Sequence, residues 1–283
     1  MLSQLPSRGS VDVVTMAKGH DMNQGEPDAV VQAERETWTR SAPIYLENTA
    51  KLTSHAVSHL LDAAHLTRDS RALEVGCGPG HVTAMMAESG ATVTGVDLVP
   101  AMIEIARRLH PDIAFVEANA EQLPFADDAF DVVLVNFVIH HFARPDVVCT
   151  EIRRVLTPGG RFVFAGPIEQ YGFGAFIEGL TAHHTMAVLA HGPLYLEATR
   201  EDYENLVKDA GFASYDVAVR QLTLHLPSLE PLLQTGWEMC ALAELSHDTQ
   251  TKIRETTIQR AGPYRTENGY AFPDRIVVGR ATK

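Results

Sequence analysis

The chain has 283 residues, of which 45% are hydrophobic and 21% are charged, a balance typical of an ordinary globular protein. Its 23 Lys and Arg against 36 Asp and Glu give a formal net charge of −13. Binding to a nucleic-acid backbone needs clustered basic residues, so we expect no nucleic-acid partner. A small neutral or cationic substrate agrees better with this charge, although a local basic pocket for one anion stays open.

The cysteines and the apolar runs indicate the class of protein. Cys77, Cys149 and Cys240 are far apart and odd in number, which favours neither a disulfide framework nor a zinc site. The longest apolar run, residues 132–139, is too short to span a bilayer, and residues 1–27 lack the apolar core of a signal peptide. We expect a cytoplasmic monomer or homodimer with no membrane partner and a flexible tail over residues 1–27.

The first half of the chain alternates between strand and helix patterns. Apolar spacing near three and four predicts a helix over residues 34–64, and TPGG at residues 157–160 is a strong turn signal. Short strands that alternate with helices imply right-handed crossovers and a parallel sheet with helices on both faces. The expected strands are 71–75, 92–96, 113–117, 130–136 and 161–165, and the expected helices are 81–89, 100–109 and 145–156.

Beyond Pro167 this alternation breaks. We expect helices over residues 174–190 and 200–210, a strand over 215–224, a mostly helical stretch over 227–260 and a last strand over 275–280. The predicted fold class is therefore α/β, a Rossmann-like, doubly wound, mostly parallel seven-stranded sheet. A helical N-terminal segment and helical cap insertions add to that sheet.

A glycine-rich turn follows the first expected strand, in the run ALEVGCGPG at residues 72–80. A strand that turns sharply into a helix needs residues that tolerate unusual φ and close approach by a ligand, and glycine supplies both. A GxGxG run alone is weak evidence, because dinucleotide-binding proteins have a similar loop. Glu74 suits a cationic ligand better than a phosphate, and Pro79 removes a backbone donor that a pyrophosphate would use.

Polar side chains follow the next three strands. Asp97 ends the second strand, where a carboxylate can accept hydrogen bonds from both hydroxyls of a ribose. Asn119 follows the third strand and Asn136 ends the fourth. Either asparagine could serve only as a turn residue. Taken together with the turn, they indicate an adenosyl ligand that carries a positive charge.

Residues 72–167 resemble the cofactor-binding core of class I S-adenosylmethionine-dependent methyltransferases. The resemblance is to the small-molecule group, known as type 11, that includes the ubiquinone and menaquinone methyltransferases. LEVGCGPG, TGVDLVPAMIEIAR, ANAEQLPFADDAFDVVLVNFVIHHF and EIRRVLTPGGRFVF match it in order and at the expected separations. The resemblance implies S-adenosyl-L-methionine as the cofactor and a small molecule as the methyl acceptor.

The resemblance also implies cofactor contacts, residue by residue. Many relatives carry Asp where this chain has Asn119, and the amide still offers an acceptor to the adenine amino group. Cys77 is expected to be only a small residue of the turn rather than a nucleophile. The implied contacts are Glu74, Gly76 and Gly78 for the methionine part, Asp97 for the ribose, Leu98, Met102, Asn119 and Ala120 for the adenine, the backbone around Asn136 for the amino group, and Tyr45, Cys77, Gly80, Glu121 and His141 elsewhere around the cofactor.

Three residues are candidates for acid–base catalysis. His140 and His141 follow the fourth strand, near the expected point of methyl transfer, and a His can take a proton from a hydroxyl or amine near neutral pH. One of the two could instead pack under the cofactor, so we expect different roles for them. Glu169, just past the fifth strand, is the third candidate, and its alternative is a surface acid.

The remaining histidines of interest lie on the predicted cap helix. His184 and His191 could face one pocket at helical spacing, with His183 beside them. A metal site needs a third ligand, which the sequence does not supply, so we expect no metal. Four segments are predicted, namely the tail 1–27, a helical lid 28–66, the cofactor-binding core 67–168, and residues 169–283 with the rest of the sheet and the substrate cap.

The predicted function is methyl transfer to an oxygen, nitrogen or carbon atom of a small molecule, in secondary or cofactor metabolism. An alternative is a protein that binds the cofactor without transferring methyl, as a structural partner or a rearrangement catalyst. A nicotinamide-dependent oxidoreductase is a second alternative, against which Glu74, Pro79 and the GxGxG spacing argue. Fold does not determine the acceptor.

Overall fold

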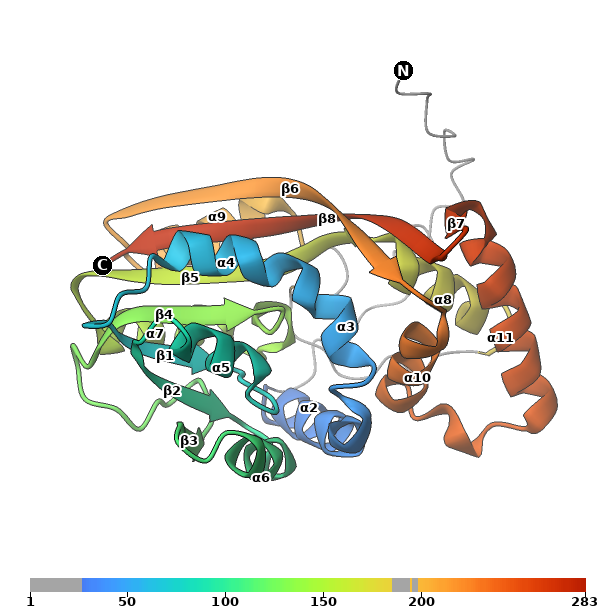
Figure 1. Cartoon of the computed structure of the whole chain (residues 1–283), viewed down its shortest axis with the longest axis horizontal. Coiled ribbons are helices and arrows are strands. Elements are labelled where there is room, and N and C mark those ends of the chain that lie inside the picture. The colour runs from blue at the N-terminus through green and yellow to red at the C-terminus, as the bar shows by residue number, and fades with distance from the viewer. Residues whose placement is uncertain (1–26, 185–193, 195–197) are drawn as a thin grey trace, which may run out of the picture.

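The computed structural model describes residues 27–184, 194 and 198–283. One sheet forms its centre, with strand order β3-β2-β1-β4-β5-β8-β6 and a two-residue strand, β7, paired to β8 beside this path (Figure 1). The pairs from β3 to β5 are parallel, and β8 runs antiparallel to both β5 and β6. The strands are β1 Arg71–Val75, β2 Thr92–Asp97, β3 Ala114–Glu117, β4 Phe130–Asn136, β5 Leu156–Gln170, β6 Ser214–Leu226, β7 Arg265–Thr266 and β8 Gly269–Thr282.

Helices cover both faces of the parallel part of the sheet, as the Rossmann-like prediction requires. In Figure 1, α4 and α5 lie in front of the sheet and α7 and α9 behind it. The α-helices are α2 Pro27–Ser41, α3 Thr49–Thr53, α4 Val57–Ala64, α5 His81–Ala87, α6 Pro100–Leu109, α7 Pro145–Val155, α8 Tyr171–Thr181, α9 Arg200–Asp209, α10 Glu230–Met239 and α11 His247–Ala261. Short 3₁₀ turns are η1 Ala42–Ile44, η2 Ser54–Ala56, η3 Ile139–His141, η4 Leu242–Glu244 and η5 Gly262–Tyr264.

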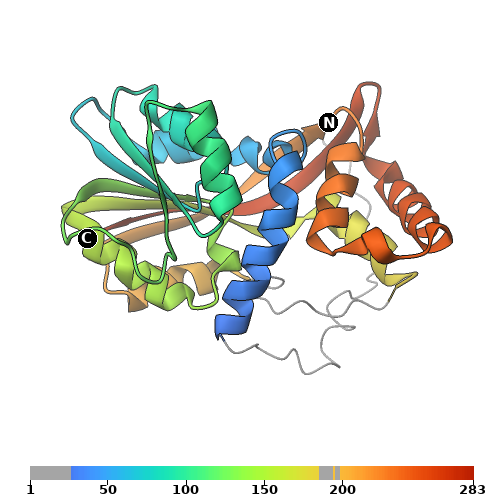
Figure 2. The ribbon, with the colours of Figure 1, turned by 90° about the horizontal axis from the view of Figure 1, so that it is seen from below.

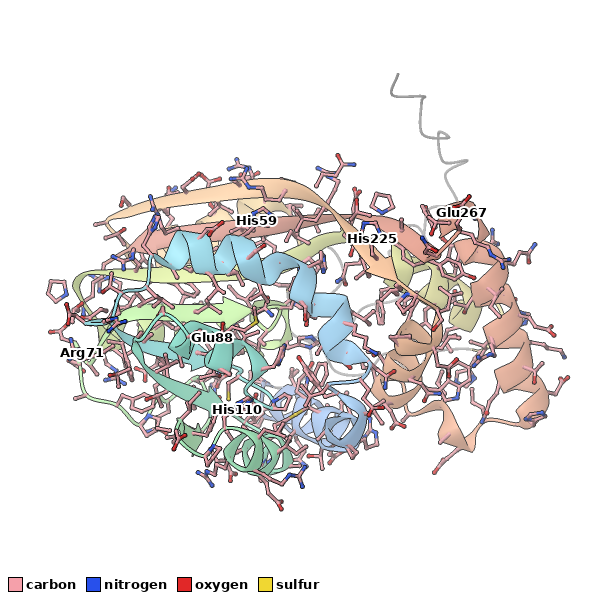
Figure 3. The ribbon with its side chains drawn as sticks, viewed as in Figure 1. His59, Arg71, Glu88, His110, His225 and Glu267 are labelled. Carbon is pink, nitrogen blue, oxygen red and sulfur yellow. The ribbon has the colours of Figure 1, made fainter. Side chains whose placement is uncertain are left out.

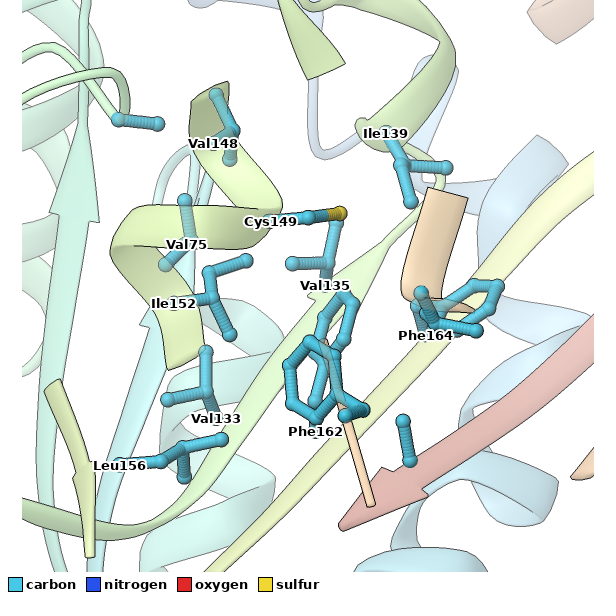
Figure 4. Close-up of a cluster of buried hydrophobic side chains, with 14 of the residues drawn as sticks. Val75, Val133, Val135, Ile139, Val148, Cys149, Ile152, Leu156, Phe162 and Phe164 are labelled. Atoms are coloured by element: carbon cyan, nitrogen blue, oxygen red, sulfur yellow. The ribbon is translucent and has the colours of Figure 1, made fainter. Parts of the chain in front are cut away.

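The central strand β4 shows why the sheet is buried on both faces. Side chains alternate between the two faces of a strand, so a strand covered twice needs an unbroken apolar run. Val133 and Val135 pack on the α7 side, with Phe162 and Phe164 of β5 (Figure 4). Val132 and Leu134 pack on the α4 and α5 side. The apolar run of β4 therefore fills two hydrophobic clusters at once.

The N-terminal segment differs from the single helix predicted over residues 34–64. Helix α2 ends at Ser41, and η1, α3 and η2 follow before α4 begins. Pro43 stands in the first turn of η1, where it cannot donate a backbone hydrogen bond to the preceding helix. Asn48, with φ −125° and ψ −77°, departs from helical geometry before α3. These two residues break the segment into pieces that wrap the sheet.

A second helical layer stands at one end of the sheet and forms the cap. Helices α8, α10 and α11 share one hydrophobic cluster with the long ends of β6 and β8, around Phe176 and Phe272. The helix predicted over residues 174–190 was wrong in its bounds, because α8 begins at Tyr171 and ends at Thr181. His183 and His184 follow in a turn whose N–H groups donate to the Leu180 carbonyl, and residues 185–190 lie outside the described part of the chain.

Strand β5 is longer than the predicted 161–165 and crosses the predicted domain boundary at residue 168. Its pairing with β4 jumps from Leu156 to Arg161, so the predicted turn lies within this irregularity, where Gly159 has φ +78°. Past Pro167, β5 continues beside β8 as far as Gln170. Among the described helices, none is long and apolar enough to cross a membrane.

Candidate functional site

A cavity of about 620 Å³ opens at the carboxyl ends of the parallel strands, between the core, the N-terminal segment and the cap. This volume is in the range of ligand pockets, roughly 300–1,000 Å³. Figure 2 shows α2 (blue) crossing between the core helices and α10 (orange) beside it. The predicted site residues that line the cavity are Tyr45, Gly76, Asp97, Leu98, Met102, Asn119, Ala120, Glu121, His140, His141 and Glu169.

The glycine-rich turn brings backbone to the cavity wall. Gly76 has φ +74°, a conformation that strains other residues, and its N–H donates to the Val96 carbonyl at 2.8 Å. A Cβ at Gly76 would lie 2.6 Å from Val138 Cγ1. Only glycine therefore lets this turn pass Val138 and reach the cavity.

Asp97 connects the turn to the end of β2. Its two carboxylate oxygens accept hydrogen bonds from the N–H of Gly78 at 2.8 Å and from the N–H of Val99 at 2.9 Å. Burial raises the pKa of the carboxyl, and the backbone hydrogen bonds oppose that shift. Each oxygen keeps a further lone pair, so the carboxylate can also accept from a ligand hydroxyl at the cavity.

Glu74 lies beneath the turn and does not line the cavity. The side chain is 2% exposed, and the hydroxyl of Thr83 on α5 donates to its carboxyl group. Burial raises the pKa of Glu74 to about 8, although the bond from Thr83 opposes the rise. The residue therefore supports the turn from below, and its predicted cofactor contact stays a prediction.

Three further residues of the turn are not among those that line the cavity. Cys77 is 2% exposed and packs against Ile103 and Phe115, and burial raises its thiol pKa far above the ordinary value. Gly78 donates to Asp97, as described. Gly80, with φ +83°, precedes α5 at a point where a Cβ would lie 2.7 Å from Phe115. Their part in cofactor binding stays a prediction.

Asn119 and Glu121 form the wall below β3. The Asn119 side-chain oxygen accepts from the N–H of Glu121 at 3.0 Å, so it holds this loop in a turn. Its amide group retains two N–H donors for a ligand. Glu121 pairs with Arg144, whose Nε donates to Oε2 at 2.9 Å. Leu98, Met102 and Ala120 complete this largely apolar part of the wall.

Asn136 ends β4 with a buried acceptor. The side chain is 7% exposed, and among the described residues its Oδ1 has no hydrogen-bond partner. A buried amide oxygen without a donor costs about 1–3 kcal/mol, which a ligand donor would recover. Phe137 follows with φ +54°, so the chain turns sharply into η3. Asn136 is not among the residues that line the cavity, so its predicted contact with the cofactor stays a prediction.

Tyr45 and Trp38 cover the cavity from the N-terminal segment. Their rings meet edge to face with centroids 5.9 Å apart, and both line the cavity. Burial raises the pKa of the Tyr45 hydroxyl, and the charges of Asp97 and Glu74 add to the rise. The hydroxyl is therefore protonated and can donate a hydrogen bond.

His141 is held by a residue that the sequence analysis did not single out. Glu34 of α2, 7% exposed, places its Oε1 3.2 Å from His141 Nδ1, and its Oε2 accepts from Trp38 Nε1–H at 2.8 Å. The Trp38 ring meets the imidazole edge to face at 5.2 Å. His140 is buried, and its ring centroid lies 4.1 Å from that of His141. The i, i+4 spacing of Glu34 and Trp38 was visible in the sequence, but their partner was not.

Glu169 lies on the cavity wall in an ion pair. Arg275 of β8 donates to its carboxylate at 3.0 Å, and both side chains are more than 40% exposed. The carboxylate on the cavity wall is thus engaged by a guanidinium group. The predicted catalytic role of Glu169, like those of His140 and His141, stays a prediction.

The cap contributes an apolar wall with a few polar groups. The Thr49 and Thr235 hydroxyls share a hydrogen bond of 3.1 Å, and Asp274, 1% exposed, has Oδ2 3.5 Å from His55 Nε2. Burial lowers the pKa of His55 to about 4, so this imidazole is neutral at pH 7. The apolar residues of this wall are Leu52, Phe173, Ile177, Leu224, Leu232 and Met239.

The histidines considered for a metal do not meet in the described part of the chain. His183 Nε2 lies 2.7 Å from Thr256 Oγ1, which ties the turn after α8 to α11. His191 lies outside the described residues. Across residues 27–184, 194 and 198–283, no three His, Cys, Asp or Glu side chains gather as metal ligands would.

Comparison with known proteins agrees with the core of the chain. Residues 73–164 match the family model described as a methyltransferase domain. A demethylmenaquinone methyltransferase of Clavibacter sepedonicus is 32% identical over 176 residues, which cover 56% of this chain and 71% of that protein. The corresponding enzyme of Chlorobaculum parvum is 45% identical over 94 residues, but these cover 33% of this chain and 39% of the relative.

The solved structures agree on the fold. The YcgJ protein of Bacillus subtilis superposes with a TM-score of 0.58 at 19% identity, over 81% of this chain and 98% of that one. The chain spans less than half the length of several curated relatives that it matches.

Proposed function

The chain belongs to the class I S-adenosylmethionine-dependent methyltransferases, and on that premise we propose that it methylates a small, largely apolar acceptor that is neutral or cationic. One observation carries the proposal. The strand ends that hold Gly76, Asp97 and Asn119 share a single cavity with the apolar wall of the cap. A donor and an acceptor bound there lie within one enclosed space.

The cofactor of this family, S-adenosylmethionine, supplies an activated methyl group on a sulfonium centre. Several residues have the chemistry to hold it. Asp97, on the cavity wall, can accept hydrogen bonds from ribose hydroxyls. The backbone at Gly76 allows close approach, while Leu98 and Met102 offer apolar contact to an adenine ring.

The charge of the cavity supports the choice of acceptor. Among its described lining residues there is no Lys or Arg. An anionic acceptor would meet repulsion from carboxylates without a lining cation to offset it. Arg144, Arg260 and Arg275 do pair with three of these carboxylates, but their side chains are about half exposed. The lining carboxylates are Glu34, Asp97, Glu121, Glu169, Glu178 and Asp274.

The protein's contribution to methyl transfer is alignment, exclusion of water and removal of a proton where the acceptor must lose one. His141 lines the cavity with its Nδ1 held by Glu34, so its other ring nitrogen is the candidate base. Tyr45 and Trp38 cover the cavity from the N-terminal side and exclude water.

Binding of the demethylated cofactor, S-adenosylhomocysteine, is the first test, by titration calorimetry. Turnover is then measured with labelled methyl donor and four probes that share one phenyl ring and carry an amine, a phenol, a thiol or a carboxylate. We expect binding, with methyl transfer to the amine or the phenol and none to the carboxylate. Absence of binding would refute the assignment, and preference for the carboxylate would refute the acceptor class. Binding without transfer to any probe or to cell extract would favour a protein that only binds the cofactor.

A further inference from the structure

Glu34, Trp38 and His141 form a buried cluster on the cavity wall that joins the N-terminal helix to the turn after β4. Glu34 and His141 come from α2 and η3, 107 residues apart in the chain. Their side chains are 9% and 10% exposed, and all three residues line the cavity. The cluster is therefore a built part of the site and not a surface ion pair.

We propose that Glu34 is the positioning residue that makes His141 the base of the reaction. This inference rests on the proposed function and adds to it a residue from outside the cofactor-binding core. Glu34 acts through His141 and is not itself assigned a contact with the acceptor.

The geometry determines which ring nitrogen carries the proton. A carboxylate only accepts hydrogen bonds, so its contact with Nδ1 requires a proton on that nitrogen. In the neutral ring the lone pair then stays on Nε2, the nitrogen that would take a proton from an acceptor in the cavity. Trp38 Nε1–H donates to Glu34 Oε2 and limits rotation of the carboxylate. The cluster thereby selects one tautomer and one ring orientation.

The same contact balances charge during the reaction. As the acceptor atom forms its bond to the methyl group and the sulfur–methyl bond breaks toward sulfur, His141 Nε2 takes the proton that the acceptor loses. The positive charge leaves the sulfonium and reappears on the imidazolium, where Glu34 stabilises it at 3.1 Å. No further reactant is needed for an acceptor with an O–H or N–H group.

The arrangement also makes the base depend on the docking of α2. Arg35, beside Glu34, pairs with Glu117 at the end of β3, and Arg40 donates to the Glu238 carbonyl at the end of α10 at 3.5 Å. Helix α2 thus contacts both the core and the cap while it presents Glu34 to the cavity. The core alone cannot supply this carboxylate.

The test compares Glu34→Gln with Glu36→Gln in the full chain. Both positions lie on α2, but Glu36 is exposed and accepts a bond from Gln32, so it is a matched control. The tautomer of His141 is read by ¹⁵N NMR of histidine-labelled protein, assigned with His141→Gln. The reactivity of the unprotonated Nε2 is read as the rate of modification by diethyl pyrocarbonate, with exposed His225 of β6 as the internal reference (Figure 3).

We expect the Nδ1–H tautomer of His141 in the wild type and in Glu36→Gln. In Glu34→Gln, the single amide oxygen cannot accept well from both Trp38 and His141, so the Nε2–H form should become populated and modification should slow at least about fivefold. Glu34→Asp should restore part of the rate. Affinity for S-adenosylhomocysteine should change less than twofold in these variants.

Two outcomes would overturn the inference. One is the Nε2–H tautomer in the wild type, and the other is a Glu34→Gln variant that keeps the wild-type tautomer and modification rate. Loss of S-adenosylhomocysteine binding by the wild-type chain would instead refute the proposed function, and the tautomer measurement would still stand by itself.

Discussion

The sheet core and the cap build their walls of the cavity in different ways. In the core, the turn at Gly76, the carboxylate of Asp97 and the amide of Asn119 each follow a strand end. Their positions are set by parallel pairing between neighbouring strands, which brings carboxyl ends to one edge. A short local motif therefore predicts a long-range site.

No comparable short sequence motif predicts the residues of the cap wall. Phe173, Leu224 and Leu232 come from α8, β6 and α10, and they meet because β5, β6 and β8 extend past the parallel sheet and carry these helices. Any apolar residue of suitable shape would satisfy the same packing. The wall that we propose to hold the methyl donor can therefore be predicted from sequence, whereas the wall that we propose to hold the acceptor depends on packing.

The largest expected effect comes from a substitution in the core wall, which should weaken binding of the cofactor. Asp97→Ala removes a carboxylate that can accept two charge-assisted hydrogen bonds from a ribose, each contributing about 1.5–3 kcal/mol. We expect affinity for S-adenosylhomocysteine to fall at least about 100-fold in titration calorimetry. Asp112→Asn, at an exposed acid, is the control and should bind like the wild type. If the Asp97→Ala protein is folded and its affinity for S-adenosylhomocysteine is within threefold of the wild-type value, Asp97 does not contact the cofactor.

The next substitution disturbs the packing of the cap and leaves the residues of the core wall unchanged. A Cβ at Gly179 of α8 would lie 2.3 Å from Thr257 Oγ1 and 2.9 Å from the Ile253 carbonyl of α11. We expect Gly179→Ala to lower the free energy of unfolding by about 1–3 kcal/mol in urea titrations. Gly174→Ala on the same helix meets nothing within 4 Å and should be neutral or stabilising. Equal stability of the two variants would contradict the close packing of α8 on α11.

Burial of Glu74 under the turn should make the stability of the protein depend on pH. Glu74 has a pKa of about 8 in the folded protein, above its ordinary value, so the folded state binds more protons than the unfolded state between these values. Its contribution to stability is therefore present at low pH and is lost as pH rises through about 8. Glu74→Gln cannot ionise, so its stability relative to the wild type should improve by about 3 kcal/mol from pH 5.5 to pH 8.5.

Thermal or urea unfolding of both proteins at the two pH values checks this expectation. Glu88→Gln, at an exposed position just after α5, should show no such pH-dependent difference from the wild type. A difference between Glu74→Gln and the wild type that stays constant with pH would mean that the Glu74 carboxyl is ionised throughout.

The smallest effect concerns the link between the lid and the core. Arg35 and Glu117 form an ion pair with side chains 40% and 45% exposed. A double-mutant cycle with Arg35→Gln and Glu117→Gln should give a coupling below about 1 kcal/mol, because exposed pairs are screened by water. The coupling should shrink further at high salt. A larger value that resists salt would show that this pair holds α2 in place.

Much of the core could be predicted from sequence because its signals are local. The apolar run of β4, the glycines of the turn and the alternation of strands and helices each reflect a constraint on a few consecutive residues. Errors arose where a constraint was not local. Pro43 and Asn48 interrupt an apolar pattern that continues across them, and α8 ends at Thr181 although its pattern continues to residue 190.

By itself, the sequence determined the α/β class, the order of the elements around the glycine-rich turn and the family to which the chain belongs. Only the tertiary structure decided that Glu74 lies under the turn, that Glu169 is paired with Arg275, and that Glu34 holds His141. The physical reason is distance along the chain. A strand and its turn are specified by neighbouring residues, whereas a contact between residues 107 positions apart exists only when the folded sheet brings α2 across its edge.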